Sequence, residues 1–110
     1  MSFVVESSLR FGRQAKRLLK KYPSLTGELA LLMDDLAKEP HQGTPLGKNL
    51  YKIRLAVKSK GAGRSGGARV ITCVKIVSRR VIMAAIYDKP EVETMTDREL
   101  AQVVIENMGP

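Results

Sequence analysis

Apolar residues in the first part of the chain recur at helical spacing. A helix capped by Ser7 or Ser8 and ending near Tyr22 would bury one apolar stripe and carry six bases elsewhere. That stripe consists of Phe11, Ala15, Leu18, Leu19 and Tyr22. A second helix, capped by Ser24 and closing before Pro40, repeats the spacing with Leu25, Leu29, Leu32, Met33 and Leu36. Both stripes need a sheet to cover them, which predicts an antiparallel helical hairpin packed on one.

Alternation replaces helical spacing after residue 49. In the predicted strand 50–58, Tyr51, Ile53, Leu55 and Val57 alternate with Lys52, Arg54, Ala56 and Lys58. In the strand 68–77, Val70, Thr72 and Val74 face one way, and Arg69, Ile71, Cys73 and Lys75 face the other. The strand 81–87 is apolar on both faces, which favours a position covered on both sides. Residues 41–48 contain three Gly or Pro breakers and are expected to form a loop.

The chain ends with a helix signal. Thr96 with Glu99 forms a capping box for a helix from Asp97 to about Asn107. The order of elements therefore indicates an α+β fold: an N-terminal helical hairpin on an antiparallel sheet of three to four strands, with a C-terminal helix. Residues 3–5 could add a short leading strand. At 110 residues we expect a single domain, 1–110.

Charge is concentrated in the middle of the chain. Residues 48–89 hold eleven Lys or Arg against one acid, Asp88, a local charge of +10, whereas residues 1–47 carry +2 and residues 90–110 carry −4. A basic middle between weakly charged or acidic ends is typical of a protein that binds a polyanion. A solvated charged surface is the alternative, but such a surface usually intersperses acids.

Several classes of protein are disfavoured. The chain has one histidine, His41, and one cysteine, Cys73, so we expect no metal site, no cofactor, no disulfide and no histidine-based triad. Cys73 is expected to be a small buried side chain. No run of about 18 apolar residues is present, so no membrane span is predicted. We expect a cytoplasmic protein.

The loop between the first two strands is rich in glycine. Gly61 to Gly66 matches the pattern G-x-G-x-x-G, but a strand and not a helix follows it, so it is not a dinucleotide fingerprint. We expect a mobile hairpin loop at 61–67. Its functional version is a basic flap in which Lys58, Lys60 and Arg64 contact a phosphate backbone.

Lys52, Arg54 and Arg69 are the candidate functional residues. A sheet needs no such cluster for folding, and like charges placed side by side cost free energy that a polyanion would offset. Tyr51 and Tyr87 are better explained as core or rim aromatics than as platforms for stacking bases.

The segments LYKIRL, GGARVI and IYDK together resemble the RelE/ParE superfamily of toxins from type II toxin–antitoxin modules, and within it the RelE/HigB-like branch. The similarity runs over nearly the whole chain. It implies a small α+β toxin that enters the ribosomal A site and cleaves mRNA. It also implies an antitoxin encoded in the adjacent gene, expected to be a small helix-turn-helix protein.

By position, the resemblance implies catalytic roles for Lys52, Arg54, Arg69 and Lys89. Tyr87, at the end of the third strand, is a further catalytic candidate, and the bases in and around the glycine-rich loop are the candidates for RNA contact. The catalytic set is Lys52, Arg54, Arg69, Lys89 and Tyr87, and the RNA-binding set is Lys48, Lys58, Lys60 and Arg64. Two positions depart from the best-known RelE pattern: Pro90 replaces a further arginine, and Thr96 replaces a tyrosine. The general acid is therefore left open between Lys89 and Tyr87.

The implied chemistry is attack of the RNA 2′-OH on the adjacent phosphate, with no metal and no protein nucleophile. Lys52 is the candidate base, and Arg54 and Arg69 would stabilise the pentacovalent phosphorane. One alternative is a ParE-like toxin that inhibits a topoisomerase without cleaving RNA. Another is a module that binds RNA without chemistry.

Overall fold

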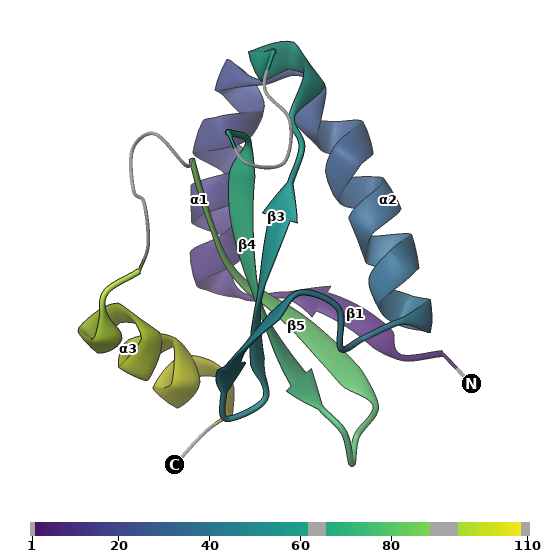
Figure 1. Cartoon of the computed structure of the whole chain (residues 1–110), viewed down its shortest axis with the longest axis vertical. Helices are drawn as coiled ribbons and strands as arrows, with labels where there is room; N and C mark the ends of the chain where they lie inside the picture. Colours follow the sequence, from purple (N-terminus) through teal and green to yellow (C-terminus); the bar gives the residue numbers. More distant parts are fainter. Residues whose placement is uncertain (1, 62–65, 89–94, 109–110) are drawn as a thin grey trace.

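The fold is α+β, with three α-helices, one single-turn 3₁₀ helix and a five-stranded sheet in the part of the chain that the structure describes. This computed structural model describes residues 2–61, 66–88 and 95–108. The elements are β1 (Val4–Ser7), α1 (Leu9–Lys21), α2 (Leu25–Lys38), β2 (Thr44–Gly47), β3 (Leu50–Leu55), the single-turn helix η1 (Lys58–Lys60), β4 (Ala68–Lys75), β5 (Arg80–Asp88) and α3 (Asp97–Met108). The α1–α2 hairpin and α3 lie on opposite sides of the sheet (Figure 1).

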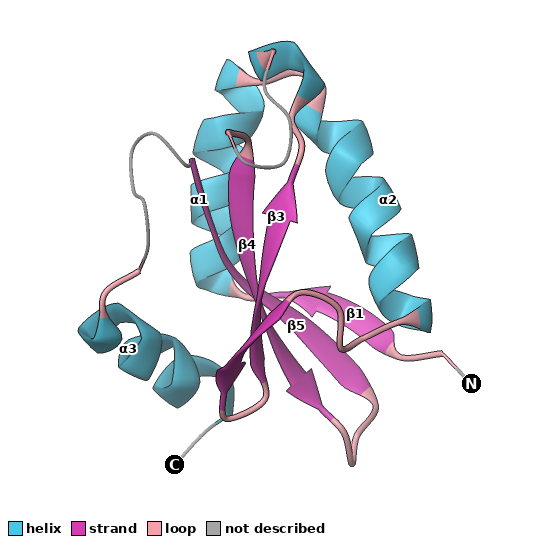
Figure 2. Ribbon diagram, viewed as in Figure 1, coloured by secondary structure: helices cyan, strands magenta, loops and turns pink. Residues whose placement is uncertain are grey.

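The sheet has more strands than the sequence predicts. Its order is β1-β5-β4-β3-β2, with antiparallel pairing throughout except that β1 runs parallel to β5. The predicted loop 41–48 is wrong in part, because Thr44–Gly47 pairs with β3 as an edge strand (Figure 2). An edge strand tolerates Pro45, since the strand has no second neighbour that needs a donor. The expected leading strand is present as β1.

Two apolar clusters fill the two faces of the sheet. The first joins the hairpin to one face and includes Leu18, Leu25, Leu36, Val70 and Ile86, all fully or almost fully buried. The second joins α3 to the other face through Ile71, Cys73, Tyr87, Met95 and Val103. The predicted alternation of β4 is therefore confirmed, and β5 is covered on both faces as expected. Met33 departs from its predicted stripe and is 37% exposed.

Two of the three predicted side-chain caps, at Ser8 and Thr96, are confirmed. The Ser8 hydroxyl caps α1 by accepting a hydrogen bond from Phe11 N (3.1 Å). At α3, Glu99 N donates to Thr96 Oγ1 (3.1 Å), and Thr96 N donates back to the Glu99 carboxylate (3.3 Å). Ser24 begins α2 without a capping bond of its own side chain, because its hydroxyl bonds Glu28 and Ser59.

The predicted strand 50–58 ends early, at Leu55. The backbone N–H groups of Lys58 and Ser59 donate to Glu28 Oε2 (2.8 Å) and Ser24 Oγ (2.9 Å) and not to a neighbouring strand. These bonds turn the chain into η1 over the α1–α2 connection. The predicted strand 68–77 likewise ends at Lys75, and residues 76–79 form the turn into β5.

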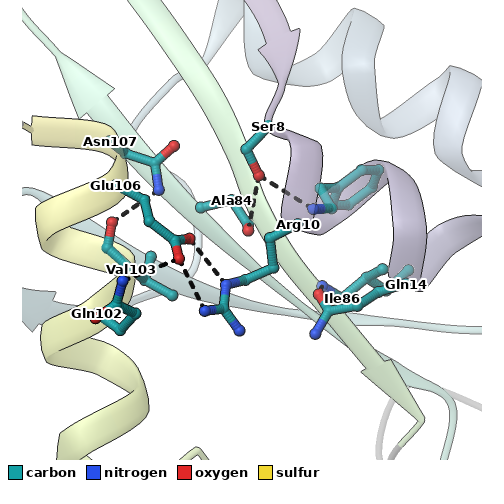
Figure 3. A network of polar contacts seen from close by, with 10 residues as sticks. Ser8, Arg10, Gln14, Ala84, Ile86, Gln102, Val103, Glu106 and Asn107 are labelled. Carbon is teal, nitrogen blue, oxygen red and sulfur yellow. Dashed lines mark hydrogen bonds and ion pairs between the residues drawn. The ribbon is translucent and has the colours of Figure 1, made fainter.

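Polar contacts fasten α3 to α1 (Figure 3). The Arg10 guanidinium donates two hydrogen bonds of 2.9 Å to the Glu106 carboxylate, and Gln102 donates to the same group. The hydrogen bond from Arg10 is the main cause that lowers the pKa of Glu106. On the β5 side, Ile86 N donates to Gln14 Oε1 (3.0 Å).

No helix in the described residues has the length and apolar character needed to cross a membrane.

Candidate functional site

Three predicted site residues form a row across three adjacent strands. Arg54 on β3 lies opposite Arg69 on β4, and Arg69 lies opposite Tyr87 on β5. Directly paired residues point to the same face of a sheet, and Tyr87 belongs to the apolar cluster shared with α3. The Arg54–Arg69–Tyr87 row therefore lies on the α3 face of the sheet.

Lys52 lies one row further along the same face. It is opposite Ile71 on β4 and opposite Thr44 on the edge strand β2. Its backbone is approached closely by Gly43, where an added Cβ would lie only 2.6 Å from the Lys52 carbonyl oxygen. Gly43 also has a φ of +101°, a conformation that favours glycine. The close approach of Gly43 and the pairing of β2 with β3 thus fix the backbone position of Lys52.

The four residues differ in their access to solvent. Arg54 is exposed and Lys52 is half-buried, whereas Arg69 is 5% exposed and Tyr87 is 6% exposed. Nη1 of Arg69 donates a long hydrogen bond to the Ala68 carbonyl oxygen (3.3 Å). A phosphate arriving at this face therefore meets Arg54 and Lys52 first. The burial of Tyr87 agrees with the expectation that it is not a stacking platform.

The predicted RNA-binding bases lie at different ends of β3. Lys48 is exposed at the tip of the β2–β3 turn, where Lys48 and Asn49 both have positive φ values. Lys58 is exposed at the start of η1, beyond the other end of β3. The six residues of β3 separate them by roughly 20 Å, so they would contact different phosphates.

Lys60 is placed differently from the other bases. Its side chain is 13% exposed, and its ammonium forms an ion pair with the buried carboxylate of Asp88. Two further predicted residues, Arg64 and Lys89, lie outside the described residues, as do Pro90 and most of the predicted mobile loop.

Sequence reasoning missed the partners of Lys60. Asp88 is 2% exposed and accepts a hydrogen bond from Tyr22 Oη (2.7 Å). The available signal was that Asp88 is the only acid in residues 48–89 and ends an apolar strand. A lone acid there is expected to be buried with a cation, because a buried charge needs a partner.

Other polar features lie away from the row. His41 Nδ1 and Tyr51 Oη share a hydrogen bond (3.1 Å), with the rings edge to face. A cavity of about 700 Å³ between α1 and α3 is lined by Ser8, Arg10, Gln14 and Glu106 among others, and by no residue of the row.

Cys73 is buried as predicted, and burial raises the pKa of its thiol. In the described ranges, no three His, Cys, Asp or Glu side chains are grouped so that they could hold a metal ion.

Comparison with known proteins gives a structural match. No protein-family model matches the sequence, and no curated protein sequence does either. The fold is similar to that of a free-state arginine-to-alanine double mutant of the E. coli toxin RelE. The two chains share 18% identity with a TM-score of 0.60, and the match covers 98% of this chain and 96% of the other. The likeness establishes a RelE-like fold.

Proposed function

We propose that this protein is the toxin of a type II toxin–antitoxin module and an mRNA endonuclease that acts on the ribosome. The observation that carries the proposal is the Arg54–Arg69–Tyr87 row with Lys52 beside it, on one face of a RelE-like sheet. The local charge of +10 over residues 48–89 supports a polyanionic substrate.

The reaction is attack of an RNA 2′-OH on the adjacent phosphorus, which forms a cyclic phosphate and releases a 5′-OH. Lys52 takes the proton of the 2′-OH, and Arg54 and Arg69 stabilise the charge that develops on the phosphoryl oxygens. Tyr87 or Lys89 protonates the leaving oxygen. Positioning of the message by the ribosome supplies much of the rate, because orientation alone can be worth about 7–11 kcal/mol.

The difference in exposure assigns an order to the contacts. Exposed Arg54 binds the phosphate first, and the phosphate then competes with the Ala68 carbonyl for the Arg69 guanidinium. The phosphate is the stronger partner, because its anionic oxygens can accept two parallel hydrogen bonds from one guanidinium, whereas the carbonyl oxygen is neutral. The repulsion between the two arginines thus lowers the stability of the free protein, and a bound phosphate offsets it in the complex.

The proposed partners follow from the same charge. The ribosome and its message offer phosphates to Lys48 and Lys58 at the two ends of β3. An acidic or amphipathic segment of a cognate antitoxin would mask the basic sheet until the toxin is released. Co-expression with the adjacent small gene should therefore yield a tight complex.

The deciding experiment is primer extension on a defined message, with purified protein and with or without ribosomes. Cleavage that needs ribosomes and persists in EDTA supports the proposal, provided that the ribosomes are first checked to remain intact under those conditions. Ribosome binding without cleavage would favour an RNA-binding module. Inhibition of a purified topoisomerase in a supercoiling assay, with intact message, would favour the ParE-like alternative.

A further inference from the structure

A buried ionic cluster lies next to the row, at the end of β5. Asp88 accepts the hydrogen bond of Tyr22 on one carboxylate oxygen, and its other oxygen contacts Nζ of Lys60. The same Nζ donates to the Gly67 carbonyl oxygen (3.2 Å). We call Tyr22, Lys60 and Asp88 the Asp88 cluster.

The cluster holds the two strand ends that carry the row. Asp88 pairs with Ala68, and the next pair along these strands is Tyr87 with Arg69. Because successive residues of a strand face opposite sides, the cluster lies on the α1 face and the row on the α3 face. The Lys60 ammonium therefore joins the start of β4 to the end of β5, directly behind Arg69 and Tyr87.

Lys60 is itself held in place from the helical hairpin. Its backbone N donates to the Val57 carbonyl oxygen (3.1 Å) within η1. The two preceding residues of η1 are bonded to Glu28 and Ser24, as described above. This arrangement leaves Lys60 little freedom to follow an RNA backbone, in contrast to exposed Lys58.

Burying the charges of Asp88 and Lys60 costs free energy, so packing alone does not explain why these residues are charged. Ions lose hydration on burial, and an apolar pair of similar volume often stabilises a fold as well or better. A directed ion pair with hydrogen bonds on both carboxylate oxygens instead fixes geometry. We infer that the Asp88 cluster positions Arg69 and Tyr87 for RNA cleavage and that Lys60 is a positioning residue, not a phosphate contact; this rests on the proposed function.

The protonation states at neutral pH suit this role. Burial pushes the pKa of Asp88 upward, but the hydrogen bonds from Lys60 and Tyr22 and the charges of Lys60 and Lys21 outweigh it and lower that pKa. The hydrogen bond to Asp88, with burial, raises the pKa of Tyr22, so the phenol remains a donor. The cluster is therefore intact under the conditions of an activity assay.

The kinetic test uses full-length protein and ribosome-bound message. Lys60→Met and Asp88→Asn should each lower kcat by about 10-fold or more with little change in KM, since a displacement of about 1 Å can cost 100-fold. Tyr22→Phe removes one donor only and should have a smaller effect of the same kind. Lys21→Met is the matched control: Lys21 is 57% exposed and 3.8 Å from Asp88, so kcat should be nearly unchanged.

Lys60→Met separates positioning from phosphate contact by its effect on the salt dependence of ribosome binding. If Lys60 contacted RNA, Lys60→Met would reduce the slope of log affinity against log salt by the equivalent of about one phosphate contact. A reduced slope for Lys60→Met with kcat unchanged would overturn the inference.

Amide hydrogen exchange of the free protein gives a readout that does not depend on RNA cleavage. Lys60→Met should lower protection at Arg69, Val70 and Tyr87 by about 10-fold or more while the β1–β5 pairing keeps its protection. Unchanged protection at these three amides would overturn the inference even if activity fell. If the wild-type protein cleaves no message, the proposed function fails, and the exchange data alone decide whether the cluster holds the row.

Discussion

Arg54 and Arg69 lie directly opposite each other on neighbouring strands, with Tyr87 next in the same row. Like charges in a direct cross-strand pair destabilise a sheet. The size of this effect is comparable to the stabilisation by a favourable pair, roughly 0.2–1 kcal/mol. The Arg54–Arg69 pair is therefore expected to lower the stability of the free protein.

Replacing one of these arginines should reveal that cost. Arg54→Thr should raise the free energy of unfolding by roughly 0.2–1 kcal/mol, because it removes the like-charge pair and introduces a residue suited to strands. The same variant should cleave message more slowly. Chemical denaturation at low and high salt would measure the gain, which should shrink as salt screens the repulsion. A loss of stability at both salt concentrations would contradict this account.

The Asp88 cluster should make stability depend on pH in the acid range. The folded-state pKa of Asp88 is lowered, so its contribution is present above the unfolded value of about 4 and is lost as pH falls through the folded value. Asp88→Asn should be less stable than the wild type at pH 7, and the difference should narrow below about pH 4. Thermal unfolding from pH 2 to pH 7 would test this. A gap that stays constant over that range would show that ionisation of Asp88 is not the cause.

Two glycines offer a matched pair of substitutions. Gly43→Ala should destabilise the fold by about 1–3 kcal/mol, since alanine is strained at a φ of +101° and its Cβ would collide with the Lys52 carbonyl. Gly12→Ala is the control, because Gly12 lies in α1 with nothing within 4 Å of the added Cβ. It should stabilise the fold by roughly 0.5–1 kcal/mol. Denaturation midpoints give both values, and a stabilising Gly43→Ala would refute the close approach.

The helices and the faces of β3 and β4 could be predicted because their signals are local. Ser8 caps α1, and Thr96 with Glu99 caps α3, within one turn of sequence. Strand alternation alone places Arg54 and Arg69 on one face once the two strands pair. Local pattern cannot give register, however, because that depends on turn lengths and on the bulge between Ile71 and Thr72.

The remaining features depend on contacts between residues far apart in the sequence. The apolar residues 3–5 indicate β1, but not its parallel pairing with β5. β2 contains Pro45 and ends at Gly47, so it has no strong strand signal. Lys60 has the appearance of a solvated base in the sequence, and only the fold brings Asp88 and Tyr22 to it. This is why a basic residue chosen for RNA contact proves to be part of a buried cluster.

The sharpest prediction concerns Arg69. If its guanidinium stabilises the phosphorane, Arg69→Ala should slow ribosome-dependent cleavage by about 100-fold or more, as does loss of one preorganised donor elsewhere. Ribosome binding should change far less, because binding to nucleic acid is the sum of many phosphate contacts and exposed Lys48, Arg54 and Lys58 remain. Lys52→Ala should behave alike if Lys52 is the base.

The controls for Arg69 come from the far end of its own strand. Lys75 ends β4, six residues and roughly 20 Å from Arg69, and Arg79 lies in the turn that follows. Lys75→Ala and Arg79→Ala remove the same charge and should leave cleavage nearly intact. Primer extension measures cleavage in all four variants, and co-sedimentation measures ribosome binding. Equal losses of binding and cleavage in Arg69→Ala would mean that Arg69 belongs to a general electrostatic surface, because a residue that acts on the transition state lowers the rate without lowering affinity to the same degree.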